Sequence, residues 1–407
     1  MIDATASFDG NGSTAAMAMQ RASSGPAVSV TVSAASSETL AAYEQFCRSA
    51  VFAPAQSGRW VRHWVGEVHP DSLMAMLNVD GRPVLALALE VVRSGPFRVA
   101  RFMGDRHANG NFAAADPEWL GRVSCQAVRS LFDEIARLRP DIDVLALQRL
   151  LPELDGRANP LSALPNFPSP NLSLAVDLDG GFDGLLDRAS GKRKRKKHRS
   201  QTRKFETAGS FRRLRATTPT EVHSLLDAFF GMKEFRFRRM GIPNAFGSAD
   251  VRVFFHALFT DALREQEPSF VLHGLEVGGK LRAVTGSSLS GKRLICEFGA
   301  IAEDELAYAS PGDFLFFENI KEACQQGFAV YDFSVGDEPY KRLWCDLETQ
   351  HVDVLVPLTA KGRALSFVLH QNARAKAFVK NSPTIWKLTK MLRRKAAGKQ
   401  TPSEDDS

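Results

Sequence analysis

The sequence lacks a long apolar run. Its 407 residues contain no stretch of about 18 consecutive apolar side chains, so a membrane-spanning helix is not predicted. The first twenty residues, MIDATASFDGNGSTAAMAMQ, also lack the positive charge and continuous apolar segment that mark a signal peptide. We therefore expect a cytoplasmic protein.

Metal-binding and disulfide spacings are equally scarce. The cysteines are odd in number, widely separated and without a CxxC pair, and the nine histidines include no HExxH motif. The five cysteines are Cys47, Cys125, Cys296, Cys324 and Cys345. We expect reduced, buried thiols and no metal site, and no motif supports a catalytic cysteine.

The net charge of +6 is concentrated in two segments. Residues 188–204 hold ten Lys/Arg and no acid, and residues 359–407 hold eleven Lys/Arg and three acids. The remaining 31 basic and 43 acidic residues leave the rest of the chain at −12. Because the basicity is local, a general nucleic-acid-binding surface is not predicted.

A chain of this length, with 44% hydrophobic and 24% charged residues, is long enough for two globular domains. Residues 1–26 are rich in Ala, Ser, Gly and Thr without periodicity, which predicts a disordered N-terminus. We expect an N-terminal domain over 27–185, a C-terminal domain over 186–358 that begins with a basic linker helix, and a basic tail over 359–407.

The two expected domains share one order of elements, in which a strand, a helical segment, three antiparallel strands, a helix and a strand follow one another. The clearest repeat is a hairpin, NVDGRPVLALAL in one copy and EVGGKLRAVTGS in the other, with a tight turn at Asp80-Gly81 and at Gly278-Gly279. In the first copy we expect a single helix, over 37–50, before the hairpin, and a long helix over about 117–139 after it. The fold class is α/β (α+β), with two tandem, mostly antiparallel sheets flanked by helices.

The motif Ser310-Pro311-Gly312-Asp313 predicts a helix N-terminus. Ser is a favourable N-cap, Pro is favoured at the first helical position, and an acid three residues after the cap resembles a capping box. The free N–H groups and the dipole of such a helix attract anions, and Gly312 leaves room for a ligand close to the backbone. A well-capped helix without a ligand is the alternative interpretation.

The stretch YDFSVGDEPYKRLW, residues 331–344, begins as an apolar strand and ends in ionisable side chains. Asp332 lies in the strand, and Gly336 ends it. The ionisable residues after the glycine are Asp337, Glu338, Tyr340 and Lys341. A phenol can protonate a leaving group and a lysine can stabilise a developing negative charge, while a solvated loop without a catalytic role is the alternative.

Glu297 is the only carboxylate in the apolar strand over 293–301. Burial raises the pKa of a carboxyl group and suits it to act as a general base. A glutamate paired with a neighbouring arginine would give the same sequence pattern.

The order of elements over 211–358, and above all GDEPYKRLW after a strand-borne Asp, resembles the GNAT acyltransferases. Within them it is most similar to the cellulose-biosynthesis acetyltransferases of the CelD/BcsL type, which are related to the FemABX transferases with their two tandem GNAT-like domains. The resemblance extends over about 30–358 and is strongest in the second half, where it implies the catalytic domain. The first half would be a degenerate copy that shapes the acceptor cleft.

The resemblance implies transfer of an acyl group, commonly acetyl, from acyl-CoA to an amine or hydroxyl, with no metal. The implied acceptor is a sugar unit in exopolysaccharide or cellulose biosynthesis. The catalytic residues would be Lys341 for the oxyanion, Tyr340 for the leaving thiolate, and Glu297 or Asp332 for the acceptor proton. Ser310, Pro311, Gly312 and Asp313 would hold the pyrophosphate. Asp337, Glu338, Lys196 and Arg199 would contact the acceptor.

Two other functions stay open on the sequence alone. A FemX-like transferase would use an aminoacyl-tRNA donor, and the acidic residues 303–305, which repel CoA phosphates, favour it. A non-catalytic scaffold of a polysaccharide synthase complex would use the basic segments for docking.

The two basic segments predict two helices. Residues 188–209 form a helix that ends at Gly209, carries charge on every side without a buried stripe, and faces an anionic acceptor or CoA, a nucleic acid, or only solvent. Its single aromatic residue, Phe205, argues against single-stranded nucleic acid. The tail mixes apolar and basic residues, is interrupted at Pro383, and would pack on the second domain or contact an anionic membrane near a polysaccharide synthase.

Overall fold

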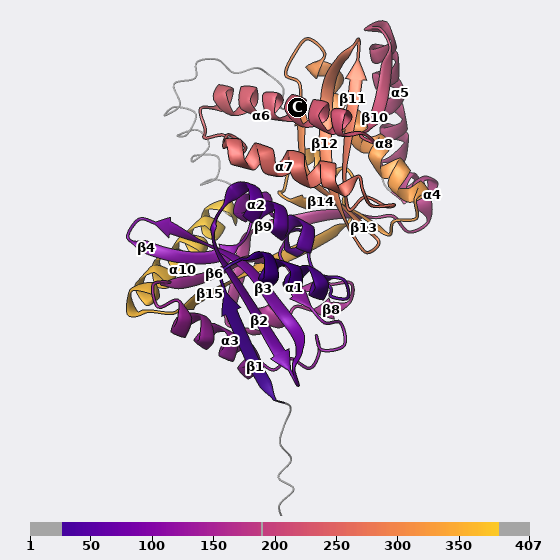
Figure 1. Ribbon diagram of the computed structural model, residues 1–407. Helices are drawn as coiled ribbons and strands as arrows, with labels where there is room; N and C mark the ends of the chain where they lie inside the picture. The colour runs from indigo at the N-terminus through magenta and orange to yellow at the C-terminus, as the bar shows by residue number, and fades with distance from the viewer. Residues whose placement is uncertain (1–26, 189, 382–407) are drawn as a thin grey trace, which may run out of the picture.

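The computed structural model describes residues 27–188 and 190–381 (Figure 1). The expected disordered N-terminus, and the tail beyond residue 381 with Pro383, lie outside the described residues. No helix in the described ranges is long and apolar enough to cross a bilayer.

The two halves repeat the same elements, as the sequence predicts. The first half contains β1 (Val28–Ser33), α1 (Ser37–Cys47), α2 (Gly58–Val68), β2 (Asp71–Val79), β3 (Arg82–Ser94), β4 (Phe97–Phe102), α3 (Cys125–Leu138) and β6 (Val144–Leu150). The second contains β10 (Phe211–Arg215), α6 (Pro219–Met240), α7 (Ala249–Ala262), β11 (Phe270–Val277), β12 (Lys280–Ser290), β13 (Arg293–Ile301), α8 (Pro311–Gln325) and β14 (Val330–Val335). In each half four antiparallel strands are followed by a parallel pair, β4 with β6 and β13 with β14.

The repeated hairpin is confirmed residue by residue. Val79 pairs with Arg82 across the first turn and Val277 with Lys280 across the second, and each hairpin carries a register shift two residues before its turn. All four turn residues have positive φ, which Asp80-Gly81 and Gly278-Gly279 tolerate.

The halves are joined by an exchange of strands. β9 (Asn166–Asp177), which ends the first half, pairs with β14 of the second, and β15 (Leu347–Pro357), which ends the second, pairs with β6 of the first. β9 and β15 also pair with each other, so a single sheet of thirteen described strands extends through both halves. The boundary expected between residues 185 and 186 stays a prediction.

The prediction of a single helix before the first hairpin is wrong. α2 was missed because its two glycines and three valines lower helix propensity. Trp60, Val61 and Trp64 nevertheless lie on one buried face, and the Trp60 ring packs 4.9 Å from that of Phe254 in α7. Packing of α2 on α7 therefore stabilises the helix. The helix expected from about residue 117 begins later, because Ser124 accepts the N–H of Ala127 and caps α3.

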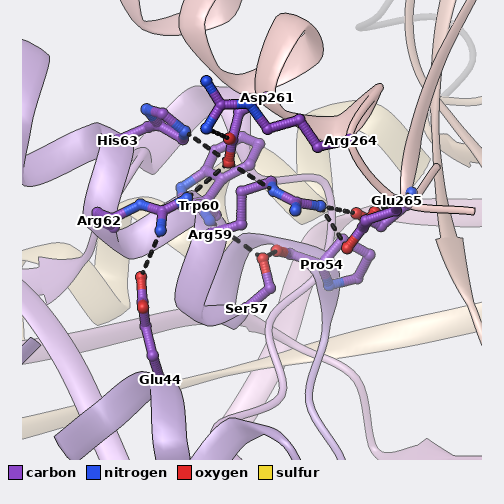
Figure 2. Close-up of polar contacts among 11 residues, drawn as sticks. Glu44, Pro54, Ser57, Arg59, Trp60, Arg62, His63, Asp261, Arg264 and Glu265 are labelled. Carbon is purple, nitrogen blue, oxygen red and sulfur yellow. Dashed lines mark hydrogen bonds and ion pairs between the residues drawn. The ribbon is translucent and has the colours of Figure 1, made fainter. Parts of the chain in front are cut away.

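Asp261 of α7 is the centre of the polar contacts between these two helices (Figure 2). Its carboxylate accepts hydrogen bonds from Arg59 at 3.0 Å, Arg62 at 2.6 Å and His63 at 3.2 Å, all from α2. Burial alone would raise the pKa of Asp261, but the contacts with His63 and Arg59 hold it below its usual value. The charge therefore stabilises the fold at neutral pH, and this contribution is lost as the pH falls below about 4.

We expect Asp261→Asn to lower the free energy of unfolding by about 1–3 kcal/mol, because an amide cannot satisfy the cations that converge on this position. Chemical denaturation at pH 7 measures the change. Asp227→Asn is the control: its exposed carboxylate contacts only His256 among the described residues, and a change within about 0.5 kcal/mol is expected. Equal stability of the two variants would contradict the role given to Asp261.

The basic helix is α5 (Gly191–Thr207), and the expectation that it lacks a buried stripe is wrong. Gly191, Gln201 and Phe205 are buried, and Phe205 is fully enclosed in an apolar cluster with β11 and α8. The one aromatic residue of the segment thus belongs to the core and offers no ring to a nucleic-acid base.

The described part of the tail is α10 (Ala360–Asn381), drawn in yellow beside the first half in Figure 1. It packs on β4, β6 and β9 of this half and on β15 of the second, so the expected packing on the second domain is found only at β15. Gly362 lies so close to the backbone of Asp143 that a Cβ on residue 362 would be 1.8 Å from the carbonyl oxygen of Asp143. Farther along the helix, the ring centroid of His370 lies 4.8 Å from that of Phe167.

Candidate active site

A cavity of about 480 Å³ lies where β13 and β14 separate. The two strands pair in parallel only as far as Ile295 and Asp332. Ser334 then adopts a φ of 58°, and Val335 pairs with Ser173 of β9. Residues 296–301 of β13 and 333–335 of β14 form two walls of the cavity. The N-terminal residues of α8, part of α6, residues 283–285 of β12 and residues around α9 complete the lining.

In the first half the corresponding gap is filled by the chain itself. β4 and β6 also pair in parallel over only three residues. Beyond them the N–H of Asn111 donates to the carbonyl oxygen of Arg149 at 2.8 Å, and the N–H of Leu151 donates to that of Asn111 at 3.0 Å. The first half therefore has no space for an extended ligand at this point, whereas the second has a cavity.

Glu297 lines the cavity from β13. Its Oε1 accepts a hydrogen bond from Ser288 Oγ at 2.5 Å, and its Oε2 accepts one from Asn109 Nδ2 at 2.6 Å. Burial raises the pKa of Glu297 to about 7, although the Ser288 and Asn109 contacts oppose the shift. Near neutral pH this carboxyl group can both take up and release a proton. No arginine is paired with Glu297 in the described structure. The alternative interpretation of the sequence, a glutamate in an ion pair with a neighbouring arginine, is therefore not observed.

Asn109 was not predicted from the sequence, because it lies in a loop of the first half, 188 residues before Glu297. The same amide also donates to the backbone oxygen of Glu297 at 2.7 Å. Ser288 of β12 was likewise missed, and only the register of the β12–β13 hairpin brings it beside Glu297.

Lys341 and Tyr340 line the same cavity from the short helix α9 (Pro339–Arg342). Lys341 is only 4% exposed; its Nζ donates to the carbonyl oxygen of Val335 at 3.0 Å and pairs with Glu338 at 2.9 Å. The Tyr340 ring stacks on Phe316 with centroids 5.6 Å apart. Burial raises the pKa of Tyr340, so its phenol is protonated at neutral pH.

The N-terminus of α8 borders the cavity, but the predicted capping box is wrong. Ser310 is the N-cap in a left-handed conformation, with φ 53°, and its side chain accepts no capping hydrogen bond. Gln201 of α5 explains this, because its Nε2 donates to the carbonyl oxygens of Ala309 at 3.0 Å and Ser310 at 2.9 Å. The carboxylate of Asp313 pairs with Lys197 instead of with the helix end.

Pro311 and Gly312 occupy the first positions of α8, as predicted. A Cβ on Gly312 would lie 2.8 Å from Cγ2 of Ile301 in β13. The glycine therefore permits the close approach of helix and strand at the cavity edge.

The acidic loop before α8 carries no unpaired charge. Glu303 pairs with Arg239 at 2.8 Å, and Glu305 pairs with Arg282 at 2.9 Å. Asp304 also pairs with Arg282. The repulsion of CoA phosphates expected from this loop is therefore largely cancelled.

Two further cavity residues change the chemistry of the site. Lys233 of α6 was not predicted, and burial together with the charge of Arg236 lowers its pKa to about 8. Burial raises the pKa of Cys296 to about 12, which leaves a neutral thiol unsuited to nucleophilic attack.

All five cysteines are free thiols, and Cys125 is exposed, contrary to the expectation that they are buried.

Four predicted site residues lie away from the cavity. Asp332 pairs with Arg293 at 2.9 Å and accepts the N–H of Ser334 at 2.7 Å. Asp337 pairs with Arg342 at 2.6 Å. Lys196 and Arg199 are exposed on α5, whereas their neighbours Lys197 and His198 face α8.

Among the described residues, no group of three or more His, Cys, Asp or Glu side chains is placed to hold a metal ion.

Residues 192–342 match the family model described as an acetyltransferase (GNAT) domain. This segment is a GNAT acyltransferase domain. The GNAT domain extends from α5 to α9. It contributes every residue that lines the cavity except Asn109. No curated protein matches the chain in sequence.

Solved structures are similar in fold. FemX is 11% identical with a TM-score of 0.52, and the match covers 80% of this chain and 97% of that chain. A conserved protein of unknown function from Bacteroides thetaiotaomicron VPI-5482 is 12% identical with a TM-score of 0.51, covering 81% and 100%. At such identities the likeness concerns the fold alone. The predicted fold and the acyltransferase class are confirmed, while the closer resemblance to cellulose-biosynthesis acetyltransferases stays a prediction.

Proposed function

We propose that this protein transfers an acyl group, acetyl in the simplest case, from acyl-CoA to an amine or hydroxyl of an acceptor. The observation that carries the proposal is the open gap between β13 and β14, with Glu297 on one wall and the start of α8 at its edge. The N–H groups of that helix end suit a pyrophosphate, and the gap suits the extended arm that leads to the thioester.

The reaction proceeds by direct attack of the acceptor on the thioester carbonyl carbon. Glu297 takes the proton of the acceptor N–H or O–H, and the carbon–sulfur bond then breaks. Tyr340 gives its proton to the departing thiolate, and Lys341 places a positive charge beside the developing oxyanion. No covalent intermediate with the enzyme is required.

The acceptor proposed on the sequence resemblance is a sugar unit of an exopolysaccharide such as cellulose, or a precursor of it. Asp337 and Glu338, at the start of α9, and the exposed cations Lys196 and Arg199 are proposed to contact it. Contact of the basic tail with a membrane or a polysaccharide synthase belongs to the same proposal.

Isothermal titration with acetyl-CoA tests the donor. We expect one site per chain and no measurable binding of an aminoacyl-tRNA. Absence of acetyl-CoA binding by folded protein would refute the proposal.

A transferase with an aminoacyl-tRNA donor is the second candidate, and the exposed cations of α5 favour it, because they form a surface suited to a polyanion. Activity that requires charged tRNA and disappears with ribonuclease would decide for it. A scaffold without catalysis would instead retain biological function in Lys341→Ala and lose it when the charges of residues 192–197 are reversed.

A further inference from the structure

A second, smaller cavity lies behind Glu297. It has a volume of about 50 Å³ and is lined mainly by polar side chains, among them Ser173, Arg293, Asp332, Thr349 and His351. Asn109, Glu297 and Ser334 line both this cavity and the main one. Glu297 therefore stands between two spaces, of which only the larger has room for substrates.

His351 of β15 is the unusual residue of the smaller cavity. Its side chain is 1% exposed, and neither ring nitrogen has a hydrogen-bond partner among the described residues. It lies at a register shift between β15 and β9. Burial lowers the pKa of His351 to about 4, so the ring is neutral and presents one N–H donor and one acceptor nitrogen.

A buried imidazole without partners is costly, because both ring nitrogens give up their hydrogen bonds with water on folding and gain none in return. Ordered water removes this cost where a cavity is polar and large enough, and about 10–15 Å³ of space open to a water molecule is sufficient for one. The cavity behind Glu297 meets both conditions for one or two water molecules. Its lining also includes Glu153, whose side chain is exposed, so the cavity reaches the surface.

We propose that this cavity holds ordered water that bridges His351 and Glu297 and carries the acceptor proton from Glu297 to solvent. The inference rests on the proposed acyl transfer, in which donor and acceptor fill the main cavity and block that route. Glu297 takes the proton from the acceptor and passes it to the bridging water, which releases a proton toward Glu153 and bulk solvent. The carboxylate of Glu297 is thereby regenerated, and Tyr340, which gave its proton to the thiolate, recovers one from solvent when the products leave.

His351 acts as a positioning residue in this path. The charged groups that face it are Asp332 and Arg149, and Arg293 neutralises Asp332 from the cavity wall. The neutral ring fixes the water by accepting and donating one hydrogen bond, and it does not need to change its own protonation state.

The first test is a crystal structure of the protein without substrates. We expect a water molecule within hydrogen-bonding distance of a ring nitrogen of His351, and a chain of water to Glu297. A dry cavity in a well-ordered structure would overturn the inference. This result does not depend on whether acetyl-CoA is the donor, so it fails or succeeds independently of the proposed function.

The second test is kinetic. His351→Phe replaces the ring with one that cannot hold water, and we expect kcat to fall about tenfold or more, the solvent isotope effect on kcat to rise, and the Kd for acetyl-CoA to stay unchanged. His351→Gln, which retains a donor and an acceptor, is expected to keep most of the activity. Thr349→Val provides the same test with a smaller change should the histidine variant fail to fold.

His107→Phe is the matched control. This histidine is also buried, with an unpartnered Nδ1, but it packs among the rings of Trp64, Phe246 and Phe255 away from both cavities. Its kcat and isotope effect should equal those of the wild type. Wild-type kcat and isotope effect in His351→Phe would overturn the proton path.

Discussion

Glu297→Gln is expected to lower kcat by about 10²–10⁴-fold, which is the usual contribution of a general base. The amide is isosteric with the carboxylate. Its oxygen can still accept the hydrogen bond from Ser288, and Asn109 keeps its hydrogen bond to the backbone oxygen of residue 297. The Kd for acetyl-CoA should not change. A Glu297→Gln enzyme with near wild-type kcat at pH 8 would show that another group takes the acceptor proton.

The pH dependence gives the same residue a second signature. Because the pKa of Glu297 is raised to about 7, only about a tenth of the protein carries the base at pH 6 and about nine tenths at pH 8. The acyl-transfer rate of the wild type should rise accordingly over this interval, and the residual rate of Glu297→Gln should not. Glu303→Gln, which alters an acid paired with Arg239 outside the cavity, should retain the wild-type profile.

The raised pKa of Glu297 also makes the stability of the protein depend on pH. A carboxyl group whose pKa is higher in the folded state stabilises that state only while it is protonated, so its contribution is lost as the pH rises from about 4.5 to 7. Glu297→Gln lacks this group and should be at least as stable as the wild type above pH 7, as measured by thermal unfolding. Loss of activity in this variant would therefore not reflect loss of fold.

Ser310→Asp is expected to weaken acetyl-CoA binding by about 10–100-fold, because it places a negative charge where the pyrophosphate meets the start of α8. The backbone permits the change: Ser310 has positive φ, and Asp and Asn tolerate that conformation better than other side chains. Isothermal titration measures the loss.

Ser310→Asn is the matched control, since it has the same shape and backbone preference without the charge. It should bind acetyl-CoA within about threefold of the wild type. Equal affinity of the Asp and Asn variants would place the pyrophosphate elsewhere.

Local sequence signals predicted the parts of this fold that local chemistry determines. Asp80-Gly81 and Gly278-Gly279 mark the two hairpins because few other residues accept their positive φ, and Pro311 marks the start of α8 because it lacks an N–H. Glu297 could be chosen because it is a lone carboxylate in an apolar strand. These inferences need only a few neighbouring residues.

The remaining features depend on contacts between distant segments. Gln201 holds the backbone of Ser310 from 109 residues away and removes the expected cap. Asn109 reaches Glu297 from the other half of the molecule, and α2 persists against its propensity because Trp60 is buried against α7. The exchange of β9 and β15 has no local sequence signal, because the sequence of either strand would be equally suited to pairing within its own half.

That exchange has a consequence for the order in which the protein can be completed during synthesis. β6 pairs with β4 on one side, but it receives its second neighbour, β15, only when residues 347–357 have left the ribosome, long after the rest of the first half is available. Until then one edge of β6, whose sequence is VLALQRL, stays unpaired, although most of its residues are buried in the finished fold. Unpaired apolar strand edges pair readily with other chains. Neither half can be finished alone, so a nascent or truncated chain that ends before β15 is exposed to aggregation however stable its own hairpins are.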